Sequence, residues 1–292
     1  MEIVRFRLDQ LPPKRDNLSL ALGHFDGVHK GHQSLFVATS MGASGDAGAL
    51  LFSKPFGKGP FLSSVEDKIR LCLSSRLDVL YVLDNDESFF QLTPEGFMDL
   101  LENLGVSRVC VGPDFRFGSK ALGTPETLKG RFQTEIVPLL TYQGEKVSSS
   151  LIKDLLLQGE VHPAAERLGH SYEIMGKVQE GFHNGEKLGY PTANIIPTFD
   201  YLLPRPGVYC CAVYVSGIAY RAMVNVGTNP TLGLLDHPIV EAHILDYDGD
   251  CYGKTLYCAF LSYIREEKRF NSLEELKAQL EKDERVVRDL FA

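Results

Sequence analysis

The distribution of apolar residues divides the chain into two halves of different character. In the first half, short apolar runs alternate with stretches in which apolar residues recur at helical spacing. The runs, which we expect to be buried strands, span residues 18–22, 50–52, 79–83 and 106–111. The helical stretches span residues 33–41, 64–73, 93–104 and 149–157. This alternation predicts an α/β domain with a parallel sheet and helices on both faces.

Local signals mark where several of these elements begin and end. Ser64 followed by Asp67 is a capping pattern, and Thr93-Pro94 combines an N-cap residue with proline at the first helical position. Gly105 suits the position just after a helix. The glycine- and alanine-rich segment 42–48 is predicted to be a loop.

The second half consists of β-branched and aromatic runs separated by turn residues rather than by helices. These runs span residues 208–215, 220–226, 240–245 and 256–264, and they predict a small antiparallel barrel or sandwich. One helix follows, with Ser272 and Glu275 as a capping box. Its expected apolar face consists of Leu273, Leu276, Leu280, Val287 and Leu290. We place the domain boundary at 168–171, which gives domains of residues 1–169 and 170–292.

Composition narrows the classes of protein to which the chain can belong. The length of 292 residues favours two domains, and the net charge of −8 argues against nucleic acid as the main partner. No apolar run is long enough to span a membrane, and the first residues lack the apolar core of a signal peptide. The six cysteines form no C-x-x-C pair, so we interpret them as small apolar residues in a reducing cytoplasm.

The strongest chemical signal is the segment GHFDGVHKGH at residues 23–32, between a predicted strand and a predicted helix. A strand, a glycine-containing turn and a helix together direct backbone N–H groups at a phosphate. His29 and His32 add side-chain donors or cations to this anion site. The alternatives are a surface feature at a helix start or an incomplete metal site, although no further Cys/His/Asp cluster lies nearby in the sequence.

A second candidate anion site is VSSSLIK at residues 147–153. Ser148 or Ser149 can cap the predicted helix, and Lys153 lies one turn further on, on the same side as Ser149 and Ser150. Taken alone, this stretch is equally consistent with a capped helix that carries a solvated lysine. Its combination with the histidine motif favours a phosphate site.

The second half contains a glycine-rich stretch with candidate metal ligands. Gly181, Gly185 and Gly189 lie at four-residue spacing and leave the backbone accessible to phosphates. An ordinary turn is the alternative interpretation. Thr192 and Asn194 favour the phosphate site, because alternate residues of an extended chain face one side and supply oxygen ligands for Mg²⁺.

The motifs GHFDGVHKGH, VGPDFRFG and VSSSLIK, in this order, resemble the nucleotidyltransferase half of prokaryotic bifunctional riboflavin kinase/FMN adenylyltransferases. The resemblance implies a Rossmann-like nucleotidyltransferase domain in which His29 and His32 contact ATP phosphates and stabilise the departing pyrophosphate. It implies further nucleotide and phosphate contacts at Gly23, Phe25, Asp26, Gly31, Ser149, Ser150 and Lys153. Asp114, Phe115 and Arg116 would line the FMN site.

The second half resembles the riboflavin kinase domain of the same family through LGYPTANI, LPRPGVY, VNVGTNPT, EAHILDYDGDCYGK and IREEKRFNSLEELKAQL. The resemblance implies a β-barrel kinase in which Thr192 and Asn194 bind Mg²⁺ and ATP phosphates. It makes Glu241 the base that deprotonates the riboflavin 5′-hydroxyl. The remaining implied contacts to nucleotide or flavin are Gly181, Lys187, Gly189, Asn225, Arg265 and Phe270.

The chain departs from the family pattern at three places. Lys153 stands where arginine is usual, which keeps the charge but loses the bidentate fork. Ser53-Lys54-Pro55 replaces Pro-His-Pro, and Glu186-Lys187 replaces Gly-Arg. The first two departures both lie in the half that resembles the adenylyltransferase.

We therefore expect an enzyme that phosphorylates riboflavin to FMN with ATP and Mg²⁺ and then adenylylates FMN to FAD. The alternatives are a chain that retains only the kinase, a non-catalytic flavin or nucleotide sensor, and an adenylyltransferase for another acceptor. The expected partners are riboflavin, FMN and ATP, with no nucleic acid and no membrane. We expect a cytoplasmic monomer or weak homo-oligomer.

Overall fold

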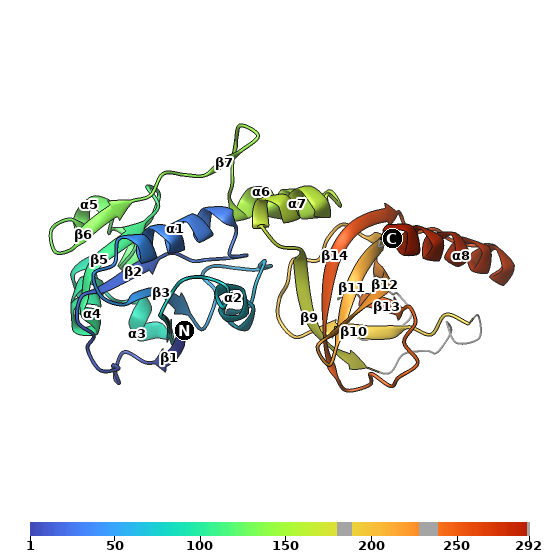
Figure 1. The fold of residues 1–292 in the computed structure, drawn as a ribbon, viewed down its shortest axis with the longest axis horizontal. Coiled ribbons are helices and arrows are strands. Elements are labelled where there is room, and N and C mark those ends of the chain that lie inside the picture. Colours follow the sequence, from blue (N-terminus) through green and yellow to red (C-terminus); the bar gives the residue numbers. More distant parts are fainter. Residues whose placement is uncertain (180–188, 228–238, 291–292) are drawn as a thin grey trace. The chain divides into compact units, whose positions relative to one another are not determined.

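The computed structural model describes residues 1–179, 189–227 and 239–290, which belong to two compact units (Figure 1). The first unit is Met1–Ser149 and the second is Ser150–Ala292. None of the described helices is both long and apolar enough to cross a membrane.

The first unit is built on a parallel sheet, as the alternating pattern predicts. Its strand order is β1-β4-β3-β2-β5-β6, and every neighbouring pair is parallel. The strands are β1 (Glu2–Phe6), β2 (Leu18–Leu22), β3 (Ala47–Phe52), β4 (Val79–Leu83), β5 (Val106–Val111) and β6 (Gln133–Ile136). The chain moves outward from β2 through β3 to β4 and then returns to the other side of β2 with β5. The topological switch therefore lies between β2 and β5, where open α/β sheets bind ligands.

Helices connect these strands and cover both faces of the sheet. They are α1 (Lys30–Met41), α2 (Val65–Cys72), α3 (Glu87–Phe90), α4 (Pro94–Leu104), α5 (Pro125–Leu128) and the 3-10 helix η1 (Ser119–Ala121). A small hairpin of β7 (Thr141–Tyr142) and β8 (Glu145–Lys146) completes the unit. The capping box of Ser64 and Asp67, the Thr93 N-cap and the left-handed Gly105 all form as predicted.

Alternate residues of β2 point into two separate apolar cores. Leu20 packs in one core with residues of α4 such as Leu101, and Ala21 packs in the other with residues of α1 and α2, including Phe36 and Ile69. Each of these five side chains is buried. The predicted arrangement of helices on both faces is thus confirmed.

The prediction of a loop over residues 42–48 is wrong at its C-terminal end, because β3 begins at Ala47. Gly48 lies within the strand, where a Cβ atom would approach Val79 Cγ1 of the neighbouring β4 to 2.8 Å. Glycine is required there by this close packing rather than by a turn.

The second unit is a closed barrel with the strand order β10-β13-β12-β11-β14-β9. The strands are β9 (Tyr172–Gln179), β10 (Ala193–Pro197), β11 (Gly207–Val215), β12 (Ile218–Gly227), β13 (Ile239–Ile244) and β14 (Thr255–Arg265). All neighbouring strands are antiparallel, which confirms the barrel. Helices α6 (Ser149–Leu157) and α7 (Val161–Leu168) precede it in the chain, and the boundary at 168–171 stays a prediction.

Helix α8 (Leu273–Leu290) closes the described chain but buries less than its pattern predicts. Val287 is fully buried and Leu280 partly, whereas Leu273 and Leu290 are 63% and 55% exposed, so they are not part of the packed face. At its start, the Glu275 backbone donates to Ser272 Oγ, but the Glu275 carboxylate accepts from the Asn271 backbone. Only half of the predicted capping box therefore forms.

Candidate functional site

The histidine motif occupies the turn that connects the C-terminal end of β2 to α1. His29 is the N-cap of α1, and its Nδ1 accepts a hydrogen bond from the His32 backbone N at 3.3 Å. Because Nδ1 acts as the acceptor, the proton of the neutral ring lies on Nε2, which is then a donor. A Cβ atom on Gly31 would lie 3.1 Å from the His29 ring, so glycine lets the ring fold over the helix start.

The two imidazoles of the motif form a stacked pair. Their ring centroids are 3.6 Å apart with an interplanar angle of 16°. Phe25 is fully buried and meets the His32 ring edge-on at 5.2 Å, so its side chain supports this ring from the core. Gly23 leaves room for Phe25, since a Cβ atom there would lie 3.0 Å from its ring.

Burial makes both imidazoles neutral at physiological pH. It lowers the pKa of His29 to about 4, with a smaller contribution from Lys146. It also lowers the pKa of His32 well below its usual value, and the neighbouring His29, Lys68 and His24 act in the same direction. Of the two roles that the sequence allows, donor or cation, the neutral donor is the one that this site favours in the absence of an anion.

Asp26 connects the motif to the segment before α2. Its Oδ1 accepts from the backbone N of Leu62 at 2.9 Å and of Ser63 at 3.1 Å, while Gly27 N donates to Ser63 Oγ at 2.7 Å. Ser149 Oγ, at the start of α6, donates to the backbone carbonyl of Asp26 at 2.9 Å. The two predicted anion motifs are thus in direct contact through Ser149.

The rest of the second motif continues along α6. Ser150 is exposed and Lys153 is half-buried one turn later on this helix. Their roles at the nucleotide stay predictions.

The segment that follows β5 contains the predicted FMN residues. The Asp114 carboxylate pairs with Lys146 Nζ at 2.8 Å, and this contact lowers the pKa of the carboxyl. Phe115 stacks on Phe117 with centroids 5.8 Å apart and packs against the core. Arg116 is exposed, and its NH1 donates to the Phe115 carbonyl. Asp114 and Arg116 are therefore both accessible from solvent, whereas Phe115 is partly buried.

The departure at Ser53-Lys54-Pro55 lies in a fixed loop. The fully buried Asn85 accepts from Lys54 N at 2.8 Å and donates to the Lys54 carbonyl at 3.0 Å. Phe56, two residues further on, stacks on His24 with centroids 4.5 Å apart. The loop after β3 thus reaches the histidine motif through an aromatic contact that the sequence pattern did not reveal.

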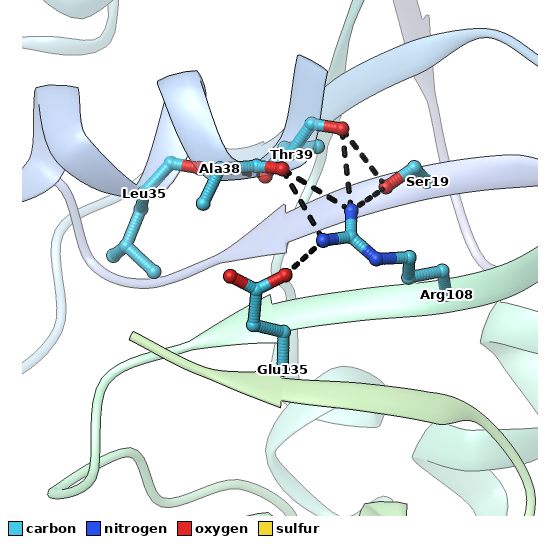
Figure 2. Close-up of polar contacts among 6 residues, drawn as sticks. All are labelled: Ser19, Leu35, Ala38, Thr39, Arg108 and Glu135. Carbon is cyan, nitrogen blue, oxygen red and sulfur yellow. Dashed lines mark hydrogen bonds and ion pairs between the residues drawn. The ribbon is translucent and has the colours of Figure 1, made fainter. Parts of the chain in front are cut away.

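A buried arginine holds the opposite end of α1 (Figure 2). Arg108 of β5 is 6% exposed, and its NH1 and NH2 donate to the Ala38 carbonyl at 3.3 and 3.2 Å. NH1 also reaches the Thr39 carbonyl and Ser19 Oγ, and NH2 pairs with Glu135 of β6. One side chain therefore connects three strands to the C-terminal end of the helix whose N-terminus carries His29.

In the barrel, strand register brings three of the predicted kinase residues into one row. Glu241 of β13 is directly opposite Asn194 of β10 on one side and Asn225 of β12 on the other. Directly opposite residues of antiparallel strands share a face, so the carboxylate lies between two amides. Arg265 lies further along the sheet, since it pairs with Val208, which pairs with Asn225, next to an irregularity in the register of β11 and β14.

Thr192 lies two residues before Asn194 and just outside β10, so its place on the face of Asn194 stays a prediction. The residue before Thr192 is held by β13, because the Pro191 carbonyl contacts His243 Nδ1 at 2.8 Å. The buried Tyr190 packs against the His243 ring and joins the core beneath α8.

The environment of Glu241 suits a base. Burial raises the pKa of this carboxyl, and the charge of Glu267 raises it further. Glu267 accepts a hydrogen bond from Asn225 Nδ2 at 3.1 Å and lies against Gly227. A carboxylate whose pKa is raised accepts a proton more readily than an ordinary glutamate does.

The predicted flavin contacts Arg265 and Phe270 are already engaged with each other and with α8. Arg265 donates through Nε and NH2 to the carboxylate of Asp283, which is 2% exposed. Its guanidinium also lies 5.9 Å from the centre of the Phe270 ring. Arg265 therefore fixes the start of the 266–270 segment to α8, and its contact with Phe270 joins the two ends of this segment.

Gly181 and Lys187 lie outside the described residues. Gly189 is described, with φ of +80°, and no heavy atom lies within 4 Å of the position of a Cβ atom there.

Sequence reasoning missed four functional candidates, namely Lys68, Arg108, Glu267 and Asp283. Arginine or lysine within an apolar run, as at Arg108, was the available signal for a buried cation.

Comparison with known proteins gives matches for both units. A riboflavin kinase family model matches residues 168–291, and an FAD synthetase family model matches residues 11–151. The chain is 34% identical to a bifunctional riboflavin kinase/FMN adenylyltransferase from Listeria monocytogenes, over 94% of this chain and 93% of the relative. The corresponding protein of Bacillus subtilis is 33% identical over 94% and 92%, and that of Escherichia coli K12 is 31% identical over 100% and 98%.

A solved structure shares the fold over nearly its whole length. It is a crystal structure described as a macrolide-efflux protein from Streptococcus pneumoniae, with a TM-score of 0.87 and 29% identity. The match covers 98% of this chain and 99% of that chain.

Proposed function

Because this chain belongs to the bifunctional riboflavin kinase/FMN adenylyltransferase family, we propose that each of its two sites carries one step of FAD synthesis. The chain phosphorylates riboflavin to FMN in the barrel and adenylylates FMN to FAD in the α/β domain. The row of Asn194, Glu241 and Asn225 is the observation that carries the first assignment. Matches to both family models disfavour a chain that retains only the kinase.

In the kinase step, Glu241 accepts the proton of the riboflavin 5′-hydroxyl. The oxygen then forms a bond to the γ-phosphorus of ATP, the bond from that phosphorus to the β-bridging oxygen breaks, and ADP leaves. The raised pKa and the half-buried position of Glu241 support this role. A solvated strand glutamate would have neither property.

Thr192 and Asn194 are the residues that would hold Mg²⁺ with the ATP phosphates. Hydroxyl, amide and carboxylate oxygens are the hard ligands that this ion prefers, so the donor set at the row fits it. The ion, when bound, neutralises phosphate charge. Among the described residues, no group of three or more His, Cys, Asp or Glu is placed to hold a metal ion.

In the adenylyl step, an FMN phosphate oxygen forms a bond to the α-phosphorus of ATP, and pyrophosphate leaves. The FMN phosphate is already an anion, so this step requires charge stabilisation rather than a strong base. His29 Nε2–H is a preorganised donor for the leaving phosphates, and His32 is stacked against it. Gly23, Asp26, Gly31, Ser149, Ser150 and Lys153 complete the proposed nucleotide site, with Arg116 for the FMN phosphate.

The cellular location, oligomeric state and domain boundary of the enzyme are part of the same proposal. Its six cysteines are free thiols and five of them are buried, which supports a reducing cytoplasm. We further propose a monomer or weak homo-oligomer with the domain boundary at 168–171, and no role for nucleic acid or membranes.

A time course with riboflavin, ATP and Mg²⁺ tests both assignments in one chain. Glu241→Gln should lower FMN formation by about a hundredfold or more while added FMN is still converted to FAD. His32→Ala should stop at FMN. Glu281→Gln on the exposed face of α8 is the matched control. Undiminished FMN formation in Glu241→Gln would contradict the role of the base.

The thermal stability of Glu241→Gln provides a second test of the base. Since burial raises the pKa of Glu241, its ionised form opposes folding, and this penalty appears as the pH rises through the folded-state pKa. Glu241→Gln should therefore not lower the thermal unfolding midpoint at neutral pH. A lowered midpoint would indicate a structural carboxylate.

A further inference from the structure

Lys68 is a buried cation that neither proposed step uses. It lies on α2 and is only 6% exposed. Lysine side chains are almost never fully buried without a partner. No hydrogen bond or ion pair joins its ammonium to the described residues, and its Nζ is not among their fully enclosed polar atoms without a partner, so the ammonium keeps some access to solvent. A buried charge in this condition is costly, so the residue requires an explanation.

The start of α2 is fixed to the histidine motif. The Asp26 carboxylate accepts from the backbone of Leu62 and Ser63, and Gly27 N donates to Ser63 Oγ. Lys68 follows directly, with its backbone N bonded to the Ser64 carbonyl in the first turn. Phe25 of the motif and Ile69 of α2 also pack in one core cluster.

Lys68 belongs to a region in which the basic groups, an ammonium and several imidazoles, outnumber the carboxylates. Burial lowers the pKa of both His24 and His32, and the charge of Lys68 lowers both further. Two carboxylates, Asp26 and Asp67, act on Lys68 in the opposite sense. Both are already engaged, Asp26 by two backbone N–H groups and Asp67 by the Ser64 backbone and hydroxyl.

A site that contains several imidazoles and a buried ammonium, but whose acids are already engaged, is suited to a polyanion. A phosphate that binds here supplies the negative charge that the ammonium lacks. It also raises the pKa of the neighbouring imidazoles, which then take up a proton. The proposed adenylyl step generates such an anion at this end of the sheet.

We propose that Lys68 binds the β- and γ-phosphates of ATP and the pyrophosphate that leaves with them. This inference rests on the proposed adenylyl transfer and adds a cation from α2 to the groups of the turn after β2 and Ser149. Lys68 is a contact to the leaving group, so its removal should affect pyrophosphate more than FAD.

The reverse reaction isolates this contact, because FAD and pyrophosphate give FMN and ATP only at the adenylyl site. In Lys68→Met we expect the KM for pyrophosphate to rise about ten- to a hundredfold, with the KM for FAD little changed. Lys68→Arg should recover part of the loss. Lys129→Met is the control, because Lys129 is an exposed lysine of the same domain that pairs with Glu126. Riboflavin phosphorylation should stay unchanged in all variants.

Thermal unfolding distinguishes a phosphate contact from a structural lysine. Removal of a buried charge that has no hydrogen-bonded partner should leave the unliganded midpoint equal or higher, and should shrink the upward shift that pyrophosphate produces. An unchanged KM for pyrophosphate in Lys68→Met would overturn the inference, as would a lowered midpoint with loss of kcat alone. Lys68→Gln replaces Lys68→Met if the latter does not fold.

Failure of the proposed function itself has a separate signature. If the wild-type chain forms no FAD, adenylyl transfer fails as a function, and histidine NMR still tests Lys68 through pyrophosphate alone. Pyrophosphate should then shift the His32 resonances in wild type and much less in Lys68→Met. Equal shifts in both proteins would overturn the phosphate contact.

Discussion

Asn225 and Glu267 are joined by a hydrogen bond of 3.1 Å from the amide Nδ2 to the carboxylate Oε1. This bond holds an acidic side chain of the segment after β14 against the neighbour of Glu241 in the row. Burial raises the pKa of Glu241, and the charge of Glu267 raises it further. Gly227 makes the approach possible, because any side chain at this position would collide with the Glu267 carboxylate. Through Glu267, the segment after the last strand therefore raises the pKa of Glu241, the proposed base of the kinase.

Glu267→Gln should shift the pH dependence of riboflavin phosphorylation to lower pH. Removal of the negative charge lowers the pKa of Glu241, so the base stays ionised at lower pH. The shift should be small, since Glu267 is exposed and water screens the interaction. The pH profile of kcat/KM measures it, and Glu266→Gln, which removes a partner of Arg205, is the control. A shift to higher pH would contradict the assignment.

His29→Asn separates capping from catalysis at the histidine motif. Asparagine is a good N-cap residue, so α1 should retain its stability, while FAD formation should fall about 10²- to 10³-fold with the loss of the imidazole donor. His29→Ala should lose the same activity and about 1 kcal/mol of stability in addition. Full activity in His29→Asn would show that the ring serves only as a cap.

The depressed pKa of His29 also predicts an acid-sensitive domain. Between pH 6.5 and about 4 the unfolded chain binds a proton at this ring and the folded chain does not, so stability falls as the pH falls. Denaturant unfolding at several pH values should show a weaker fall in His29→Asn than in wild type.

Arg108→Lys should impair FAD formation without affecting the kinase. Lysine lacks the fork that binds the Ala38 carbonyl through two nitrogens, so carbonyls at the end of α1 lose partners at about 1–3 kcal/mol each. Gly42→Ala should have a similar effect, because a Cβ atom there would collide with the Arg108 guanidinium. Urea titrations that follow both activities test this, with the exposed Arg131→Lys as the control. Parallel loss of both activities would argue against a local effect.

Asp283→Asn should loosen the 266–270 segment of the kinase. Arg265 would lose the charge of its buried partner, which typically costs about 3–5 kcal/mol. We expect a lower unfolding midpoint and a higher KM for riboflavin, with FAD formation from added FMN unchanged. An unaltered KM would indicate that the ion pair serves stability alone. Asp289→Asn near the end of the same helix is the matched control.

The sequence by itself determined the local elements and the order of the motifs. Strands such as 18–22 and 106–111, the Ser64 and Thr93 caps and the turn at residues 23–32 all depend on neighbouring residues, which a single stretch contains. The two fold classes followed from the repetition of these local patterns.

Only the tertiary structure decided how distant residues combine. The row of Asn194, Glu241 and Asn225 depends on the register of three strands, and the two histidines are neutral because the core around Phe25 buries them. Lys68 reads as an ordinary basic residue of a helix until the fold buries it, and the apolar run around Arg108 indicates burial but not the partners of its guanidinium. Register, burial and charge environment are set by contacts between segments far apart in the chain, so no local pattern could reveal them.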